Sequence, residues 1–511
     1  MKITAWSCFW LLSGYALLLG ARLYPWGVER SRRATVGSGD ECNHLIIRNM
    51  LRQGKNPEDT FLMEGFDYPT AFHRLSLLFS DTFVKRLGGL LPLVFDTCLY
   101  LCAASLLVYS GAGISWVISL FVLCGAFVIH VGRNIHFSER AFGSLWGNLY
   151  LITMCLIEGS RWSPIMIGMA VIFFIGAVLA SKFAVQAVVF ISVVYAALAG
   201  TIEPIILLLV CQALGGLLSL GRTFKVQYGV WRHSSFYARY IQAVNPATTN
   251  QIQAAFRHLK AGRVKTAIKC AIWSPYGRIA LLYPLAIGAV VIALVSPEQA
   301  AARPFVMLTL SGLIVATVIA TPKLLFLGEP ERYAEYVMVA ALVGAGFYFP
   351  KADWSQPYIF VLLFAYGAAC LLAFYMHYKQ MLQYVRIGAE EDIPDFSVSL
   401  TNKRILTVPV RIAFPMALKG VDAQFIAVLT NIGDSSRQEI FQRVIPDFYP
   451  YPSSDLNSLI RSERIDMIVV KETALNKINA LSGRVYYDFS DLDLMERIGE
   501  YSVYRGRSRE A

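Results

Sequence analysis

The chain has 511 residues, of which 56% are hydrophobic and only 16% are charged, whereas soluble proteins carry roughly 25% charged residues. The charged residues are clustered, and long stretches between them contain none. This pattern excludes a soluble enzyme with a large core and indicates a protein that lies within a bilayer. The net charge is +11. Because the basic residues flank apolar stretches, we expect anionic lipid headgroups and phosphates as partners, and no nucleic acid.

Eleven stretches resemble membrane-spanning helices, which need about 20 mostly apolar residues. They are 4–21, 89–110, 114–131, 142–158, 163–180, 183–200, 202–220, 279–296, 305–321, 334–349 and 358–376. A signal peptide is the alternative for the first stretch, but no small-residue cleavage site follows it. The sequence therefore predicts a polytopic α-helical membrane protein with about eleven spans.

An odd number of spans places the two ends of the chain on opposite sides of the membrane. The side of the C-terminus, called side A, then receives the long loops 22–88 and 221–278. On the other side, side B, only four basic residues are expected: Lys2, Arg161, Arg303 and Lys351. Nearly all the polar chemistry is thus expected on side A. The positive-inside rule counts only short loops, and in these the two sides carry similar numbers of basic residues.

Loop 221–278 is basic and amphipathic. In the stretch 250–271, Ile252, Phe256 and Leu259 recur at helical spacing among basic residues such as Arg257 and Lys260. This pattern predicts helices that lie in the membrane interface. A folded external loop is an equal alternative.

The composition changes near residue 400. Apolar runs at 405–409, 425–429, 465–470 and 500–505 predict strands, and 454–461 and 473–481 predict helices. We therefore expect a membrane domain over 1–378, a linker over 379–399 and a small soluble α/β domain with a mainly parallel sheet over 400–511. The last domain contains no glycine-rich phosphate-binding motif, so nucleotide binding is not supported.

The first polar cluster on side A lies in loop 22–88. Asp40 and Glu41 are adjacent, and His44 follows them. Such a group offers a general base or ligands for a divalent metal, although paired carboxylates are common in ordinary loops. The same loop contains Tyr68 and His73, for which a turn followed by an interfacial helix is the structural alternative.

Two further clusters contain arginines, whose planar fork binds phosphate well. The segment 133–140 contains His136, Glu139 and Arg140, and its structural alternative is a membrane-flanking loop. The segment 328–336 contains Glu329 and Arg332. An acidic helix start would explain the glutamate, but an arginine at that end opposes the helix dipole, so Arg332 is the more informative residue.

Together these segments resemble the GT-C superfamily of membrane glycosyltransferases, in particular the protein mannosyltransferases and the lipid A aminoarabinose transferases. Three features carry the resemblance. They are the Asp40–Glu41 pair, the Tyr-Pro-x-x-Phe-His segment from Tyr68 to His73, and the Gly-Glu-x-x-Arg-Tyr segment that ends at Tyr333. The many-helix core with a C-terminal soluble domain agrees with that superfamily.

The resemblance implies transfer of a sugar from a polyprenyl-phosphate carrier to a glycan, lipid or protein acceptor, with inversion. Asp40 would be the general base, and Glu41 would bind acceptor or metal. The leaving phosphate would be held by cationic residues, namely Arg332, Arg140, His136 and Lys182. His44, Tyr68, His73, Glu329 and Tyr333 would support the acceptor or the loops. Some members use a divalent cation, Mg²⁺ or Mn²⁺, and here Asp40 and Glu41 would bind it.

The resemblance also places the site and the C-terminal domain on the periplasmic or external side of the plasma (inner) membrane. The alternatives are a transporter or flippase for an anionic lipid-linked saccharide, a ligase or polymerase acting on such a lipid, and a non-catalytic scaffold. Transporters tend to show internal repeats and charges within their spans. We expect neither in this chain, which disfavours transport.

Overall fold

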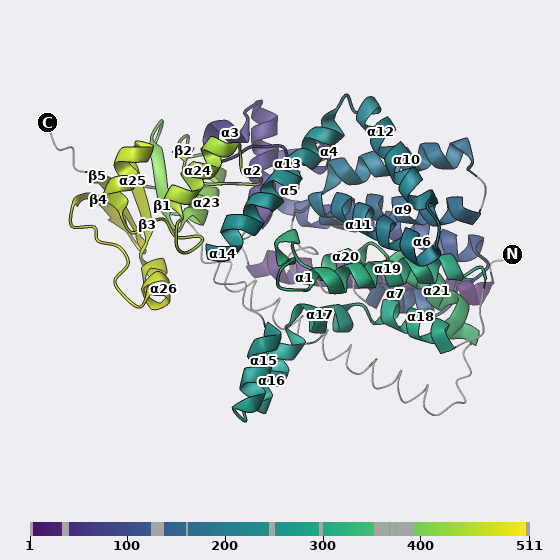
Figure 1. The fold of residues 1–511 in the computed structure, drawn as a ribbon. Coiled ribbons are helices and arrows are strands. Elements are labelled where there is room, and N and C mark those ends of the chain that lie inside the picture. Colours follow the sequence, from purple (N-terminus) through teal and green to yellow (C-terminus); the bar gives the residue numbers. More distant parts are fainter. Residues whose placement is uncertain are drawn as a thin grey trace. The chain divides into compact units, whose positions relative to one another are not determined.

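The computed structural model describes residues 4–32, 40–123, 137–159, 162–244, 251–295, 300–351 and 393–506, and the single residues 367 and 375. The chain divides into two compact units (Figure 1). The membrane unit comprises Met1–Ala34, Pro69–Gln227 and Thr249–Ile387. The sheet unit comprises Thr35–Tyr68, Tyr228–Thr248 and Gly388–Ala511.

The described part of the membrane unit is helical (Figure 1). Its elements are α1 (Ala5–Arg32), α4 (Ala71–Ser76), α5 (Asp81–Leu87), η1 (Gly88–Leu90), α6 (Leu91–Tyr109), α7 (Val117–Leu123), α9 (Arg140–Gly159), α10 (Pro164–Ala180), α11 (Lys182–Ala199), α12 (Glu203–Leu218), α13 (Arg222–Phe236), α15 (Gln251–Lys260), α16 (Val264–Ile272), α17 (Pro275–Leu282), α18 (Pro284–Val295), α19 (Arg303–Ile319), η3 (Leu325–Leu327), α20 (Glu331–Glu335), α21 (Met338–Tyr348) and η4 (Phe349–Lys351). The last nine residues of α13, from Tyr228 to Phe236, belong to the sheet unit.

Fewer helices are long and apolar enough to cross a bilayer than the sequence predicts. Among the described residues there are three, or up to five if each of two bent pairs forms one span. The three are Ala5–Tyr24, Gly88–Tyr109 and Lys182–Ala199. Several predicted spans instead form shorter apolar helices or bend, as at Pro284, because an apolar run continues through a turn that ends the helix. The spans predicted at 114–131 and 358–376 extend outside the described residues.

A buried ion pair joins α1 to α6. The guanidinium of Arg22 donates to the carboxylate of Asp96, and the two side chains are only 2% and 5% exposed. A buried charge is strongly destabilising unless it is paired, which explains why the two occur together. The expectation that no span contains a buried charge is therefore wrong. A single aspartate changes the hydropathy of an apolar stretch too little to reveal it.

The sheet unit contains a five-stranded sheet in the order β2-β1-β3-β5-β4. Its elements are α2 (Asp40–Gln53), α3 (Pro57–Thr60), η2 (Tyr237–Ile241), α14 (Gln242–Val244), β1 (Arg404–Val408), η6 (Val410–Ile412), α23 (Ala413–Leu418), β2 (Gln424–Phe425), α24 (Ser435–Val444), α25 (Leu456–Glu463), β3 (Met467–Lys471), α26 (Glu472–Ser482), β4 (Leu492–Ile498) and β5 (Tyr501–Gly506).

The sheet is mixed rather than mainly parallel. β1 pairs in parallel with β2 and β3, whereas β5 is antiparallel to β3 and β4. The predicted strands near β1, β3 and β5 are present, but β2 has only two residues. The sequence prediction missed β4, because this strand is largely exposed and polar. The turn at Gly499, which has a φ of +59°, makes β4 and β5 a hairpin.

Both faces of the sheet are covered. Alternate residues of a strand point to opposite faces, so Leu406 joins one core while Ile405 joins the other. The second core contains Ile46 and Met50 of α2 together with Met416 of α23. Part of the first polar loop therefore belongs to the hydrophobic core of the sheet unit. The predicted linker 379–399 lies largely outside the described residues, and the predicted domain boundaries stay a prediction.

The segment 61–65 lies beside the residues that follow β2. The amide of Leu62 donates to the carbonyl of Phe425 at 2.9 Å, and the amide of Gly65 donates to that of Asn431 at 2.8 Å. Between them, Glu64 is fully buried and accepts hydrogen bonds from the amides of Leu429 and Thr430, both at 2.7 Å. Further donors are the amides of Asn431 and Phe66 and the hydroxyl of Thr430.

These contacts hold the loop 429–431 against the segment 61–65, which is part of the first polar loop. Burial raises the pKa of Glu64, while the hydrogen bonds from Thr430, Asn431 and Phe66 act in the opposite direction. Because all the observed partners are donors, the geometry matches a carboxylate that accepts at both oxygens.

We predict that Glu64→Gln loosens this loop. The amide group of glutamine would face at least two N–H donors, and each unsatisfied buried group costs about 1–3 kcal/mol. The amides of residues 429–431 should then exchange hydrogen about 30- to 1,000-fold faster, as measured by mass spectrometry. Glu439→Gln on the exposed side of α24 is the control. Unchanged exchange in Glu64→Gln would show that the carboxylate does not hold the loop.

Candidate active site

Aromatic packing in the membrane unit brings α4 to the start of α9. The ring of Phe72 lies 4.8 Å from that of Phe137, centroid to centroid, and also packs against Phe95 and Phe142. His73 follows Phe72 directly, and Glu139 follows Phe137 after one residue. The apolar contact therefore determines where these two polar side chains lie.

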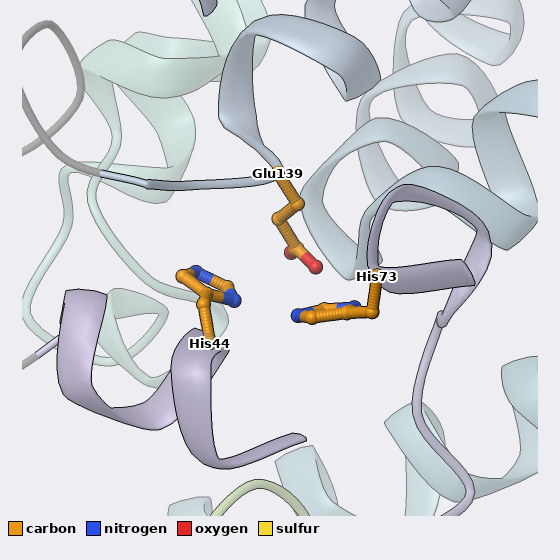
Figure 2. A group of neighbouring side chains, drawn as sticks. All are labelled: His44, His73 and Glu139. Carbon is orange, nitrogen blue, oxygen red and sulfur yellow. The ribbon is translucent and has the colours of Figure 1, made fainter. Parts of the chain in front are cut away.

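His73 and Glu139 carry potential metal ligands that lie within 4.8 Å of each other. Both residues are buried, and Figure 2 shows their side chains turned toward the same space. An imidazole nitrogen and a carboxylate oxygen are ordinary ligands of divalent metals. Two protein ligands are fewer than such an ion needs, so any metal would require further donors.

The other predicted residues of the first loop lie in the sheet unit. Asp40 is the first residue of α2, and Glu41 and His44 follow on one face of that helix because they are three residues apart. His44, which Figure 2 also labels, is buried, and so is Tyr68. The sequence therefore places the expected base and a histidine on a helix of the sheet unit.

Three of the predicted phosphate-binding residues come from elements that contact one another in the membrane unit. The guanidinium of Arg332 lies 4.1 Å from the centroid of the Phe183 ring, and Lys182 precedes Phe183 at the start of α11. Arg140 is the first residue of α9, whose Gly143 touches Ser181 just before α11. The fourth predicted residue, His136, lies outside the described residues.

The segment around Arg332 is tightly constrained. Gly328 has a φ of +110°, and a Cβ atom there would lie 2.3 Å from the Phe183 ring. Glu329 forms an ion pair with Arg332 at 2.5 Å. The hydroxyl of Tyr333 lies 2.9 Å from Oε1 of Gln186 on α11. Glu329 and Tyr333 therefore hold Arg332 in place on α11.

Sequence reasoning did not assign a role to Glu139, Phe183 or the pair formed by Arg278 and Glu331. Nη1 of Arg278 lies 2.7 Å from the fully buried Glu331 and so joins α17 to α20. Glu139 directly precedes the candidate phosphate ligand Arg140 in the sequence, and this neighbour could have marked it as a site residue. The partners of Phe183 and Glu331 depend on tertiary contacts that no spacing in the sequence encodes.

The fold resembles that of a known enzyme. Three crystal structures of the Archaeoglobus fulgidus oligosaccharyltransferase match with TM-scores of 0.54, 0.53 and 0.55. They cover 94% of this chain and 70–72% of that protein, at 12% sequence identity. They show that protein tethered to an acceptor peptide with an NVT sequon, in complex with Zn and sulfate, and in the apo form.

This chain has a GT-C fold. The likeness is one of fold alone, and it does not single out the protein mannosyltransferase or aminoarabinose transferase group. No protein-family model matches the sequence, and no curated protein matches it. The small sheet and the apolar helices agree with a membrane protein of this fold.

We predict that the His73 and Glu139 pair binds a divalent transition metal. His73→Ala and Glu139→Gln should each weaken Mn²⁺ or Zn²⁺ binding by at least about tenfold, because each removes one ligand. Isothermal titration of the purified protein measures the affinity. His258→Ala, on the distant helix α15, is the control. Equal affinities in all variants would exclude these two residues as ligands.

Proposed function

We propose that this protein is a membrane glycosyltransferase that moves a sugar from a polyprenyl-phosphate carrier to an acceptor, with inversion at the anomeric carbon. One observation carries the proposal. In a chain with a GT-C fold, Arg140, Lys182 and Arg332 come from helix starts that contact one another, and His73 and Glu139 lie beside the same end of α9. Cationic side chains and metal ligands that gather at one end of a helical unit can bind the phosphate of a lipid-linked sugar.

The cations have a defined chemical task in this reaction. When the glycosidic bond breaks, negative charge develops on the phosphate that leaves with the lipid. Donors that are already in place stabilise such charge without reorganisation. Packing on Phe183 and the ion pair with Glu329 give Arg332 a fixed position, which supports this role.

We further propose that a divalent cation is held by His73 and Glu139 of the membrane unit. An imidazole donor suits Zn²⁺ better than Mg²⁺, whereas a carboxylate also suits Mn²⁺, so Zn²⁺ joins the Mg²⁺ or Mn²⁺ that the resemblance implies. When bound, the metal would offset the negative charge of the donor phosphate. The neighbouring structure with Zn and sulfate agrees with metal chemistry in this fold.

Asp40 is the proposed general base. By resemblance, a carboxylate of the first external loop takes the proton of the acceptor, and Asp40 at the start of α2 occupies that place in the chain. The acceptor is a glycan, a lipid or a protein, and the structural neighbour bound to an acceptor peptide is consistent with the last class. We propose that the site faces the periplasm or the cell exterior.

A transporter or flippase for an anionic lipid-linked saccharide is the second candidate. The buried pair of Arg22 and Asp96 favours it, because charges within spans are typical of transport proteins. The two functions differ in their product. A glycosyltransferase releases free polyprenyl phosphate, whereas a transporter leaves its lipid-linked saccharide intact.

We predict that the protein in nanodiscs, given radiolabelled polyprenyl-phosphate sugars and acceptors, releases polyprenyl phosphate. Asp40→Asn should lose nearly all turnover, because the amide cannot take a proton at neutral pH. Asp59→Asn, an exposed change in the same loop, is the matched control. Full turnover in Asp40→Asn would remove this residue from the mechanism, and movement of an intact donor between leaflets without release would favour the transporter.

Arg332→Gln should lower kcat by about 100- to 1,000-fold, the usual effect of removing one charge-stabilising donor. Lys323→Gln, an exposed change in the preceding turn, should leave the rate unchanged. Steady-state kinetics of both variants provide the measurement. A similar kcat in Arg332→Gln and the native protein would show that this guanidinium does not contact the developing charge.

A further inference from the structure

A helical hairpin projects from the membrane unit. Helices α15 and α16 pack against each other, joined by a turn at Gly262 with a φ of +71° (Figure 1). The chain continues from α16 into α17 through Trp273. In the view of Figure 1 the hairpin extends across the direction of α18 and α19. None of the proposed catalytic or phosphate-binding residues lies on it.

The large apolar side chains of the hairpin face outward. Phe256 is 61% exposed, Leu259 53%, Val264 52% and Ile268 55%. Among the residues of both helices only Ala267 is buried. A helical hairpin that is stable in water buries its large apolar side chains between its helices. This one packs mainly through small residues, so its large side chains need another apolar environment.

The same hairpin is strongly basic. Residues 251–272 contain five Lys and Arg residues and no Asp or Glu. All five basic residues are exposed: Arg257, Lys260, Arg263, Lys265 and Lys269. A helix pair with exposed apolar side chains among cations, and with no acidic residue, has the composition of a segment that binds an anionic membrane surface.

The position of the hairpin in the chain also indicates a membrane. Immediately after it, α17 and α18 form a bent pair that is apolar and long enough to be a broken span. Trp273 and Tyr276 lie at this junction, and such aromatic residues are enriched where a span meets the headgroups. The hairpin is therefore connected directly to a segment that enters the bilayer.

We propose that the α15–α16 hairpin is a membrane-surface anchor, which inserts Phe256, Leu259, Val264 and Ile268 among lipid chains and binds anionic phospholipid headgroups with its basic residues. Charge complementarity and continuity with the bent span select this partner. The anchor is independent of the proposed glycosyl transfer, because it uses no residue of the candidate active site.

Photocrosslinking in nanodiscs tests the insertion. Benzoylphenylalanine would replace Phe256 in the full-length protein. One set of nanodiscs would contain phosphatidylcholine alone, and the other would also contain roughly 30% phosphatidylglycerol, to make the surface anionic. The same probe at Val485, which is 78% exposed on the sheet unit, is the matched control. We expect several-fold more lipid adducts at 256 than at 485. Equal yields, or adducts only to another polypeptide, would overturn the proposal.

A charge variant tests the lipid class. Lys260, Arg263, Lys265 and Lys269 would all be changed to Gln, and size-exclusion chromatography would confirm that the protein remains folded. Phosphatidylglycerol should raise the adduct yield at 256 several-fold in the basic hairpin and have little effect in the variant. The same lipid dependence in both would show that the cations do not recognise the headgroups. A less disruptive pair, Lys265→Gln with Lys269→Gln, should give an intermediate dependence if the larger variant fails to fold.

Discussion

The close approach of α9, α11 and α20 sets the positions of three cations in the membrane unit. α9 meets the start of α11 at Gly143, and Gly147 lies against Tyr336 just after α20. A side chain at either glycine would collide with its neighbour. Arg140 and Lys182 each begin a long helix, where the dipole disfavours a cation. Their positions therefore do not stabilise the helices, whereas an anion bound between them would gain from both the charges and the amides.

The sheet unit provides the first polar loop with a rigid support. α2 contributes Ile46 and Met50 to a core of the sheet, and Glu64 binds the loop that follows β2. Residues such as Asp40 and His44 consequently lie on a packed helix rather than on a free connection. A base or ligand is held more accurately by a packed helix than by a loop, which fits the role proposed for this segment.

Apolar length and polar clustering in the sequence predicted the helical class of the fold and brought forward a set of candidate site residues, whose roles stay a prediction. Lys182 and Arg332 do share one neighbourhood, and the strands near β1, β3 and β5 are present. Other features depend on contacts that spacing does not reveal. Apolar runs continue through bends such as that at Pro284, the charge of Asp96 is balanced by the distant Arg22, and β4 is an exposed edge strand without an apolar pattern.

The proposed site is tested most directly by a cryo-electron microscopy structure in nanodiscs with a polyprenyl-phosphate sugar and Mn²⁺. We expect the phosphate to contact Arg332 and Lys182, and the metal to be bound by His73 and Glu139. A phosphate bound away from these cations, with no metal at the histidine and glutamate, would contradict the assignment of this site to glycosyl transfer.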